Sequence, residues 1–215
     1  MNVVEIFLSI DGEGIRAGEL ATFVRLAGCN LRCSYCDTKY AQGMADGEEM
    51  SALAIIDRVK ELGCKNVTLT GGEPLLNKDG FILAHALAEG GYSVNIETNG
   101  SIDIGDLLDE PNVIITMDYK CPSSGCEESM CLSNLEKLRE QDVLKFVLEA
   151  SDFDAVRAVI ARYKINAQIY LSPVFGRIEP VQIVDFMKRE FRAKDNIRVQ
   201  LQLHKFIWPP EMRGV

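Results

Sequence analysis

The chain has 215 residues, 47% of them hydrophobic and 26% charged, and its formal net charge is −9. This length and apolar content predict a single globular domain over residues 1–215. The negative charge argues against a nucleic-acid partner, which would need a basic surface, and no apolar run is long enough to span a membrane. Because the N-terminal stretch lacks a basic segment followed by an apolar core, we expect a cytoplasmic protein. These properties favour chemistry on a small molecule.

Hydrophobic periodicity predicts strands and helices in alternation. The predicted strands span residues 3–10, 21–27, 66–70, 93–98, 113–118, 143–148, 167–172 and 197–203. Predicted helices lie between Ser51 and Gly63 and at residues 79–88, 132–139, 152–163 and 181–191. Such alternation implies parallel βαβ units with right-handed crossovers. About six units predict an α/β fold in the form of an incomplete TIM-like barrel, short of the eight strands of a closed one.

Three of the seven cysteines lie close together, as Cys29, Cys33 and Cys36, with the spacing C-x3-C-x2-C. In a cytosolic protein such a cluster is more often a metal or catalytic site than a disulfide framework. Structural zinc would need a fourth ligand, and no second cysteine pair with suitable spacing supplies one. Three thiolates fit a cubane iron–sulfur cluster with one iron left open for a ligand. The spacing also suits one face of a buried helix, but the neighbouring Gly28 and Asn30 favour a loop.

Polar or glycine-rich motifs follow four of the predicted strands. They are GGEP at 71–74, ETNG at 97–100, DYK at 118–120 and SPVFG at 172–176. Each could be an ordinary turn. If the strands are parallel, however, their carboxyl ends meet at one edge of the sheet, where ligands bind in such folds. We therefore expect these motifs to form one site together with the cysteine loop.

The cysteine motif, with an aromatic residue before its last cysteine, resembles the signature of radical S-adenosylmethionine (SAM) enzymes. The resemblance implies that Cys29, Cys33 and Cys36 hold a [4Fe-4S] cluster, whose open iron binds the amino and carboxylate groups of SAM. Transfer of one electron to the sulfonium then releases a 5′-deoxyadenosyl radical that abstracts hydrogen. The implied SAM contacts are Tyr35, Gly71, Gly72, Glu73, Gly100, Asp118, Tyr119, Lys120, Ser172, Pro173, Val174 and Phe175.

Further motifs resemble a narrower family, the 7-carboxy-7-deazaguanine synthases of queuosine biosynthesis. These motifs are SIDGEG at 9–14, the cysteine loop ending in Asp37 and Thr38, GGEP, ETNG and the late LHK at 203–205. The resemblance covers most of the chain. It implies a lyase that converts 6-carboxy-5,6,7,8-tetrahydropterin to 7-carboxy-7-deazaguanine with loss of ammonia, in which SAM is regenerated and Mg²⁺ assists.

Site roles follow from that resemblance. The implied substrate contacts are Ile10, Asp11, Gly12, Arg25 and Thr98. Arg25 would pair with the substrate carboxylate, for which a guanidinium fork is well shaped, and the hydroxyl oxygen of Thr38 would bind Mg²⁺. Asp11 stands where the family commonly has glutamine, and a carboxylate only accepts hydrogen bonds. The family further implies a homodimer and an electron donor such as flavodoxin or ferredoxin.

Two other kinds of protein share part of this pattern. A glycyl-radical activating enzyme also carries C-x3-C-x2-C and acts on a protein backbone, but it would not need SIDGEG, Arg25 or Thr38 in these places. A non-catalytic iron–sulfur electron carrier could also hold a cluster on three cysteines. In that case GGEP and the other polar strand ends would have no purpose.

The remaining cysteines and the two histidines lie outside these motifs. Cys121, Cys126 and Cys131 are spaced in a way that permits a second cluster, although free cysteines are usually small buried hydrophobic residues. We expect His85 on a helix surface. His204 is a better candidate for a ligand because it lies near the end of the last predicted strand, but we expect a packing role for it.

Overall fold

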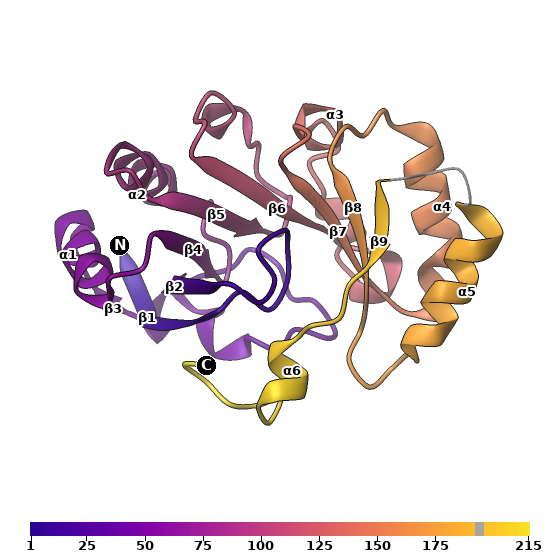
Figure 1. Ribbon diagram of the computed structural model, residues 1–215, viewed down its shortest axis with the longest axis horizontal. Coiled ribbons are helices and arrows are strands. Elements are labelled where there is room, and N and C mark those ends of the chain that lie inside the picture. The colour runs from indigo at the N-terminus through magenta and orange to yellow at the C-terminus, as the bar shows by residue number, and fades with distance from the viewer. Residues whose placement is uncertain (192–195) are drawn as a thin grey trace.

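The computed structural model describes residues 1–191 and 196–215, and Figure 1 shows one curved sheet with helices along its outer side. The strands follow the order β3-β1-β2-β4-β5-β6-β7-β8-β9. Their bounds are β1 Asn2–Ile10, β2 Leu20–Leu26, β3 Glu48–Glu49, β4 Asn66–Gly71, β5 Ser93–Thr98, β6 Val113–Tyr119, β7 Val143–Leu148, β8 Gln168–Pro173 and β9 Ile197–Val199. Within the described residues β3 and β9 are the two edges of an open sheet, which confirms the incomplete barrel.

Seven strands, β2 and β4 to β9, pair in parallel as the alternating pattern predicts. The N-terminal strand does not follow this rule, because β1 pairs antiparallel with both β2 and β3. Only a short turn separates β1 from β2, and a parallel pair needs a much longer crossover. The turn returns the chain to the sheet through a hydrogen bond of 2.8 Å from Asp11 N to Glu19 O.

The helices connect successive parallel strands, and Figure 1 places most of them on the convex side. Their bounds are α1 Ala52–Leu62, α2 Lys78–Glu89, α3 Asn134–Lys137, α4 Phe153–Arg162, α5 Pro180–Glu190 and α6 His204–Ile207. The 3₁₀ turns are η1 Lys39–Ala41, η2 Met44–Asp46, η3 Gly105–Leu107, η4 Pro122–Ser124, η5 Glu127–Ser129 and η6 Ala150–Asp152. In Figure 1, α6 and the C-terminal residues lie on the other side of the sheet, near β1 and β2.

Side chains alternate along the parallel strands between an apolar face and a polar face. In β7, Leu144 and Phe146 are fully buried in the core under the helices, whereas Lys145 between them points to the concave face. The same period of two places the polar residues of the neighbouring strands there, namely Thr70, Glu97, Thr116 and Asp118. The inside of the partial barrel is therefore polar, although the strands are buried on both faces.

Two predicted elements are shorter in the structure. The predicted helix 132–139 is only the four-residue α3, because Arg139 turns back to bond the carbonyls of Leu108 (2.7 Å) and Val113 (2.8 Å). The predicted strand 197–203 ends at Val199. The chain then leaves the sheet edge, since Leu203 N donates to Gly12 O at 3.1 Å. This departure carries α6 to the pocket described below.

Candidate active site

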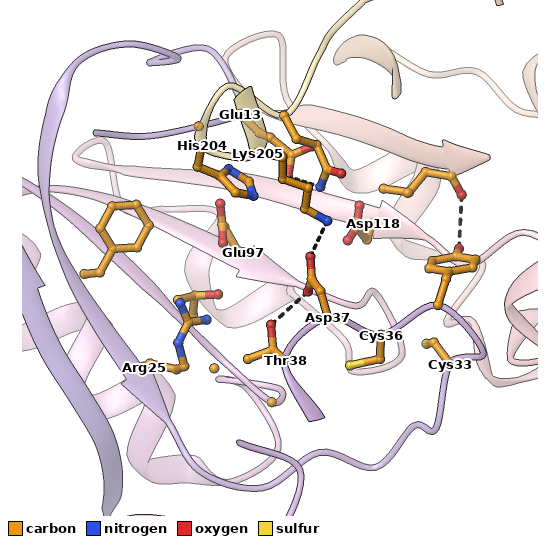
Figure 2. A pocket seen from close by; sticks show the side chains of 18 of the residues that line it. Glu13, Arg25, Cys33, Cys36, Asp37, Thr38, Glu97, Asp118, His204 and Lys205 are labelled. Atoms are coloured by element: carbon orange, nitrogen blue, oxygen red, sulfur yellow. Dashed lines mark hydrogen bonds and ion pairs between the residues drawn. The ribbon is translucent and has the colours of Figure 1, made fainter. Parts of the chain in front are cut away.

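A pocket of about 280 Å³ opens on the concave face of the sheet, at the carboxyl ends of the parallel strands. Figure 2 shows it from close by, with Cys33 and Cys36 on one loop, Arg25 across from them, and Glu97 and Asp118 on the strands behind. The pocket brings together most of the predicted site residues, namely Ile10, Gly12, Arg25, Cys29, Cys33, Tyr35, Cys36, Thr38, Gly71, Gly72, Thr98, Asp118, Lys120, Val174 and Phe175.

The three cysteines lie on a loop after β2, as Gly28 and Asn30 predict, and their thiols are free. Two contacts hold this loop over the ends of the later strands. Ser34 Oγ donates to Ser123 O at 2.8 Å, and the Tyr35 hydroxyl donates to Val147 O at 3.0 Å. The loop is therefore positioned by β6 and β7 as well as by its own strand.

These thiols suit a cluster better than a single ion. Among the described residues, no three Cys, His, Asp or Glu side chains come together to hold one metal ion. In a cubane cluster, by contrast, each cysteine binds a different iron and the sulfurs stand apart. Burial raises the pKa of Cys29 and raises that of Cys33 to about 12, although the Lys120 ammonium opposes the second shift. Binding of iron therefore displaces protons from these thiols.

The glycines of GGEP are required by packing inside the protein. A Cβ on Gly71, where φ is 149°, would lie 2.1 Å from Leu26 O, and one on Gly72 would lie 2.2 Å from Gly28 O. Glu73 N also donates to Gly28 O at 2.8 Å. The end of β4 is thus locked against the start of the cysteine loop, which explains the two glycines without a ligand.

Glu73 itself is buried away from the pocket. Its Oε1 accepts from Leu75 N (3.0 Å) and Thr98 Oγ1 (2.8 Å), and its Oε2 accepts from Asn99 N at 2.6 Å. Burial raises the pKa of this carboxyl, while these hydrogen bonds favour the ionised form. Glu73 therefore joins the ends of β4 and β5, and it is not among the residues that line the pocket.

Six of the predicted contacts do not line the pocket, and these are Asp11, Glu73, Gly100, Tyr119, Ser172 and Pro173. The Asp11 side chain is buried on the other side of its turn. Its Oδ2 lies 2.9 Å from Arg16 Nε, and its Oδ1 accepts from Thr68 Oγ1 at 2.6 Å. The family commonly has glutamine at this position. In this chain the side chain of Asp11 lies outside the pocket, so only the backbone of the residue keeps its place in the turn.

Arg25 extends from β2 into the pocket. One of its three guanidinium nitrogens is held by a contact within the protein. Its Nε lies 2.7 Å from Glu5 Oε1, and its guanidinium carbon lies 5.9 Å from the ring centroids of both Phe7 and Tyr40. Within the described part of the chain, no hydrogen bond engages its two terminal nitrogens. A guanidinium held in this way presents its fork to a ligand carboxylate.

Thr38 and Asp37 connect the cysteine loop to α6. Thr38 Oγ1 donates to Asp37 Oδ1 at 2.9 Å, and Lys205 Nζ lies 2.6 Å from Asp37 Oδ2. Figure 2 shows both contacts as dashed lines. Burial opposes ionisation of Asp37, but the Lys205 ammonium outweighs that effect and lowers the pKa of the carboxyl to about 2. The carboxyl of Asp37 is therefore ionised throughout the neutral range.

Sequence reasoning missed Lys145, and it gave no separate role to Glu13 and Glu97, although these two lie in the motifs SIDGEG and ETNG. Lys145 Nζ lies 2.9 Å from Glu13 Oε2 and 3.3 Å from Asp118 Oδ1. Burial raises the pKa of Glu97 to about 7, and the Lys145 ammonium opposes that shift. The sequence does contain a signal for such residues. Strands of a parallel sheet are buried on both faces and are usually apolar throughout, whereas here polar residues alternate with apolar ones.

His204 also lines the pocket. A Cβ on Gly12 would lie 2.1 Å from His204 Nδ1, which means that glycine allows the imidazole to rest on this turn. Burial lowers the pKa of His204, although the nearby carboxylate of Glu13 opposes the shift. His85, by contrast, lies on α2 outside the pocket, where Nδ1 is 2.7 Å from Glu110 Oε1.

The remaining cysteines do not line the pocket. Cys121 is fully buried at the end of β6, as expected of a small hydrophobic residue, whereas Cys126 and Cys131 are partly exposed. All three are free thiols.

The sequence matches the family described as Radical SAM superfamily over residues 24–164. The 7-carboxy-7-deazaguanine synthase of Clostridium acetobutylicum is 46% identical over 220 aligned residues, which cover 99% of this chain and 98% of that protein. The 7-carboxy-7-deazaguanine synthase of Chlorobaculum tepidum is 40% identical, over 100% of this chain and 97% of the relative. The chain belongs to the 7-carboxy-7-deazaguanine synthase family.

Solved structures agree with this family. QueE from Escherichia coli superposes with a TM-score of 0.73 at 25% identity and covers 94% of each chain. Streptococcus suis SuiB bound to S-adenosylmethionine has a TM-score of 0.58 at 14% identity, covering 83% of this chain and 51% of SuiB, and shares the fold alone.

Membership of the radical SAM superfamily implies a [4Fe-4S] cluster and SAM as cofactors. The pocket of this 7-carboxy-7-deazaguanine synthase fits both. It combines three free thiols with glycine-lined strand ends and a partly buried Lys120, whose Nζ lies 3.1 Å from Asp118 Oδ2. Soft thiolates suit iron, and the polar strand ends suit the charged groups of a SAM molecule.

Proposed function

We propose that this enzyme converts 6-carboxy-5,6,7,8-tetrahydropterin to 7-carboxy-7-deazaguanine with release of ammonia, within queuosine biosynthesis. The observation that carries the proposal is the placement of three free cysteines and Arg25 on one pocket, in a chain that is 46% identical to a synthase of that name. The other radical SAM alternative, activation of a glycyl radical in a protein, gives no role to the free fork of Arg25.

Cys29, Cys33 and Cys36 would hold the cluster. Bound there, the cluster supplies the electron that cleaves SAM to a 5′-deoxyadenosyl radical. The pocket residues Tyr35, Gly71, Gly72, Asp118, Lys120, Val174 and Phe175 would orient SAM. The Tyr35 hydroxyl is already bound to Val147 O, so it is the face of the ring that remains for a ligand.

The overall conversion requires no net oxidant. Substrate and product differ in composition by one molecule of ammonia, so any hydrogen atom removed from the substrate must be returned to the product. Catalytic use of SAM follows from that balance. The chain must therefore hold substrate and SAM side by side through the whole cycle, which a single pocket lined by both sets of residues permits.

The two ends of the pterin meet different walls of the pocket. Arg25 would bind the carboxylate through its two free nitrogens. Near the opposite wall, Glu13 Oε1 and Gln202 Oε1 are buried acceptors without a hydrogen-bond partner in the described residues. Buried acceptors of this kind are costly unless a ligand supplies donors, and the amino and ring N–H groups of the pterin are such donors. The charge pattern thus favours one orientation of the substrate.

Thr38 would supply a hard oxygen to Mg²⁺. Within the described residues, Thr38 Oγ1 makes one hydrogen bond, as the donor to Asp37 Oδ1, so its lone pairs remain for an ion at the pocket. A divalent cation between Thr38 and the substrate carboxylate would stabilise charge during the ring contraction. The substrate, water and Thr38 would together form its coordination shell.

Further parts of the proposal rest on the family alone. They are a homodimer and a flavodoxin- or ferredoxin-type reductant. A single domain over residues 1–215 and a cytoplasmic location are also proposed, from the sequence properties given above. Within the described residues, none of the helices has the length and apolar character to cross a membrane. The net charge of −9 leaves a predominantly acidic protein, which does not favour a nucleic-acid partner.

The test is an anaerobic assay of the reconstituted, reduced enzyme with SAM, Mg²⁺ and 6-carboxytetrahydropterin, followed by mass spectrometry. We expect 7-carboxy-7-deazaguanine and ammonia in equal amounts, without stoichiometric loss of SAM. Cleavage of SAM to 5′-deoxyadenosine with the pterin unchanged would refute the substrate. If a protein with full iron content formed neither 7-carboxy-7-deazaguanine nor 5′-deoxyadenosine, the radical SAM chemistry would be refuted.

A further inference from the structure

The segment that follows α6 returns across the pocket. Residues 210–215 line the same pocket as Arg25 and the cysteine loop, although nearly the whole sheet separates them in sequence. A turn with a hydrogen bond of 2.9 Å from Met212 N to Pro209 O directs the segment back. The pocket therefore has a wall that does not belong to the barrel.

Arg213 holds this C-terminal segment against Tyr40, which also lines the pocket. Its guanidinium carbon lies 3.7 Å from the ring centroid of Tyr40, a close stacking contact. The Tyr40 hydroxyl donates to Glu5 Oε1 at 3.0 Å, and the same oxygen binds Arg25. Arg25 and Arg213 thus approach one aromatic ring, and Glu5 binds both Arg25 and the hydroxyl of that ring.

The charges of this group do not balance. Arg25 and Arg213 carry two positive charges, and Glu5 carries one negative charge. Within the described residues, no hydrogen bond or ion pair joins Arg213 to a carboxylate, although Glu211 is near in sequence. The guanidinium is exposed at the pocket and its fork is free. An anion that enters between the two arginines would restore neutrality.

We propose that Arg213 is a second guanidinium for the substrate carboxylate and closes the C-terminal segment over the bound pterin. This inference rests on the proposed function and extends it to a specificity-determining residue. Stacking on Tyr40 holds the guanidinium plane in place, so little side-chain freedom is lost when the carboxylate arrives. Arg25 and Arg213 together select a ligand that carries a carboxylate at this end.

The test compares two ligands in the reconstituted holoenzyme. One is 6-carboxytetrahydropterin, and the other is tetrahydropterin without the carboxyl group, measured as a competitive inhibitor. For Arg213→Ala we expect the KM of the first ligand to rise by about tenfold or more, as for loss of a charge-assisted hydrogen bond. The inhibition constant of the second should stay within about twofold. Arg213→Lys should recover part of the loss, since it keeps the charge without the planar fork.

Several outcomes separate this role from a structural one. Arg189→Ala removes an exposed arginine of α5 and should change neither constant. An equal loss of affinity for both ligands would show that Arg213 only supports the pocket, and would overturn the inference. Unchanged constants for both would overturn it as well. Failure of the wild-type enzyme to convert the pterin would refute the proposed function itself, and inhibitor binding would then be the separate readout.

Discussion

Lys205 Nζ lies 2.6 Å from Asp37 Oδ2, so a residue of the last helix holds the residue that directly follows the third cysteine of the cluster motif. Lys205 is only 10% exposed, and its Nζ also lies 5.7 Å from the ring centroid of Phe175. One side chain thus contacts both the cysteine loop and the loop after β8. The integrity of the site depends on this contact from outside the barrel.

We expect Lys205→Met to weaken retention of the cluster. The methionine preserves most of the apolar stem but removes the charge that orients Asp37. Loss of a group that orients metal ligands typically lowers metal affinity by about tenfold or more. The measurement is the rate at which an iron chelator bleaches the cluster absorbance under anaerobic conditions. Asp37→Asn should produce a similar rate, and the double variant should add little, because both changes remove one contact.

An exposed lysine provides the control for that experiment. Lys164 lies on the surface after α4, and the cluster of the Lys164→Met variant should bleach at the wild-type rate. Equal bleaching of the wild type and Lys205→Met would mean that the other hydrogen bonds of the cysteine loop hold it without the contact from Lys205.

A second prediction concerns which cysteines bind iron. Alanine at Cys29, Cys33 or Cys36 should each abolish the cluster and all turnover, because each of the three thiolates would be the protein ligand of one iron. Alanine at Cys131, which lies outside the pocket, should retain wild-type iron content and activity. Iron analysis and electron paramagnetic resonance of the reduced proteins provide the readout. Retention of a full cluster in any of the first three variants would contradict the assigned ligands.

The sequence was informative where local rules act. Alternating strands and helices predicted the βα units. The helix predicted between Ser51 and Gly63 is the observed α1, and these two residues are its N-cap and C-cap. The strand-end motifs could be placed on one pocket because parallel strands align their carboxyl ends. Such statements need only periodicity and topology.

Sequence reasoning failed where side chains find distant partners. The Asp11 side chain turns away from the pocket because Arg16 and Thr68 bind it there, and nothing local reports that choice. The strand at 197–203 was overextended because Leu203 bonds to Gly12, almost the whole chain away. The requirement for glycine at positions 71 and 72 also comes from distant partners, because a Cβ there would meet the backbone at Leu26 and Gly28.

A third prediction follows from the buried Asp11–Arg16 pair. Arg16→Met would leave the carboxylate of Asp11 buried without its counter-ion, which should cost about 3 to 5 kcal/mol of unfolding free energy. In the double variant Arg16→Met, Asp11→Leu no charge is left unpaired, so much of that loss should be recovered. Urea unfolding of the three proteins measures both effects. If the single and double variants were equally unstable, the cost would reflect the other bonds of Arg16, including the one of 2.9 Å to Ser93 O.

The last prediction concerns the pH dependence of Glu97. Because burial raises its pKa from 4.5 to about 7, the folded protein binds a proton there that the unfolded chain has already released between these values. The ionised carboxylate therefore destabilises the fold progressively as pH rises from about 4.5 to 7, and the full penalty is present above that range.

Glu97→Gln removes this titration without changing the shape of the side chain. We expect the variant to be more stable than the wild type at pH 8, by about 1 to 3 kcal/mol after allowing for the lost attraction to Lys145. Around pH 4.5 most of this advantage should be lost. Urea unfolding of the cluster-free proteins at the two pH values provides the measurement. The same difference at both pH values would show that Glu97 does not titrate in this range, and its charge would then be balanced by Lys145 in the folded pocket.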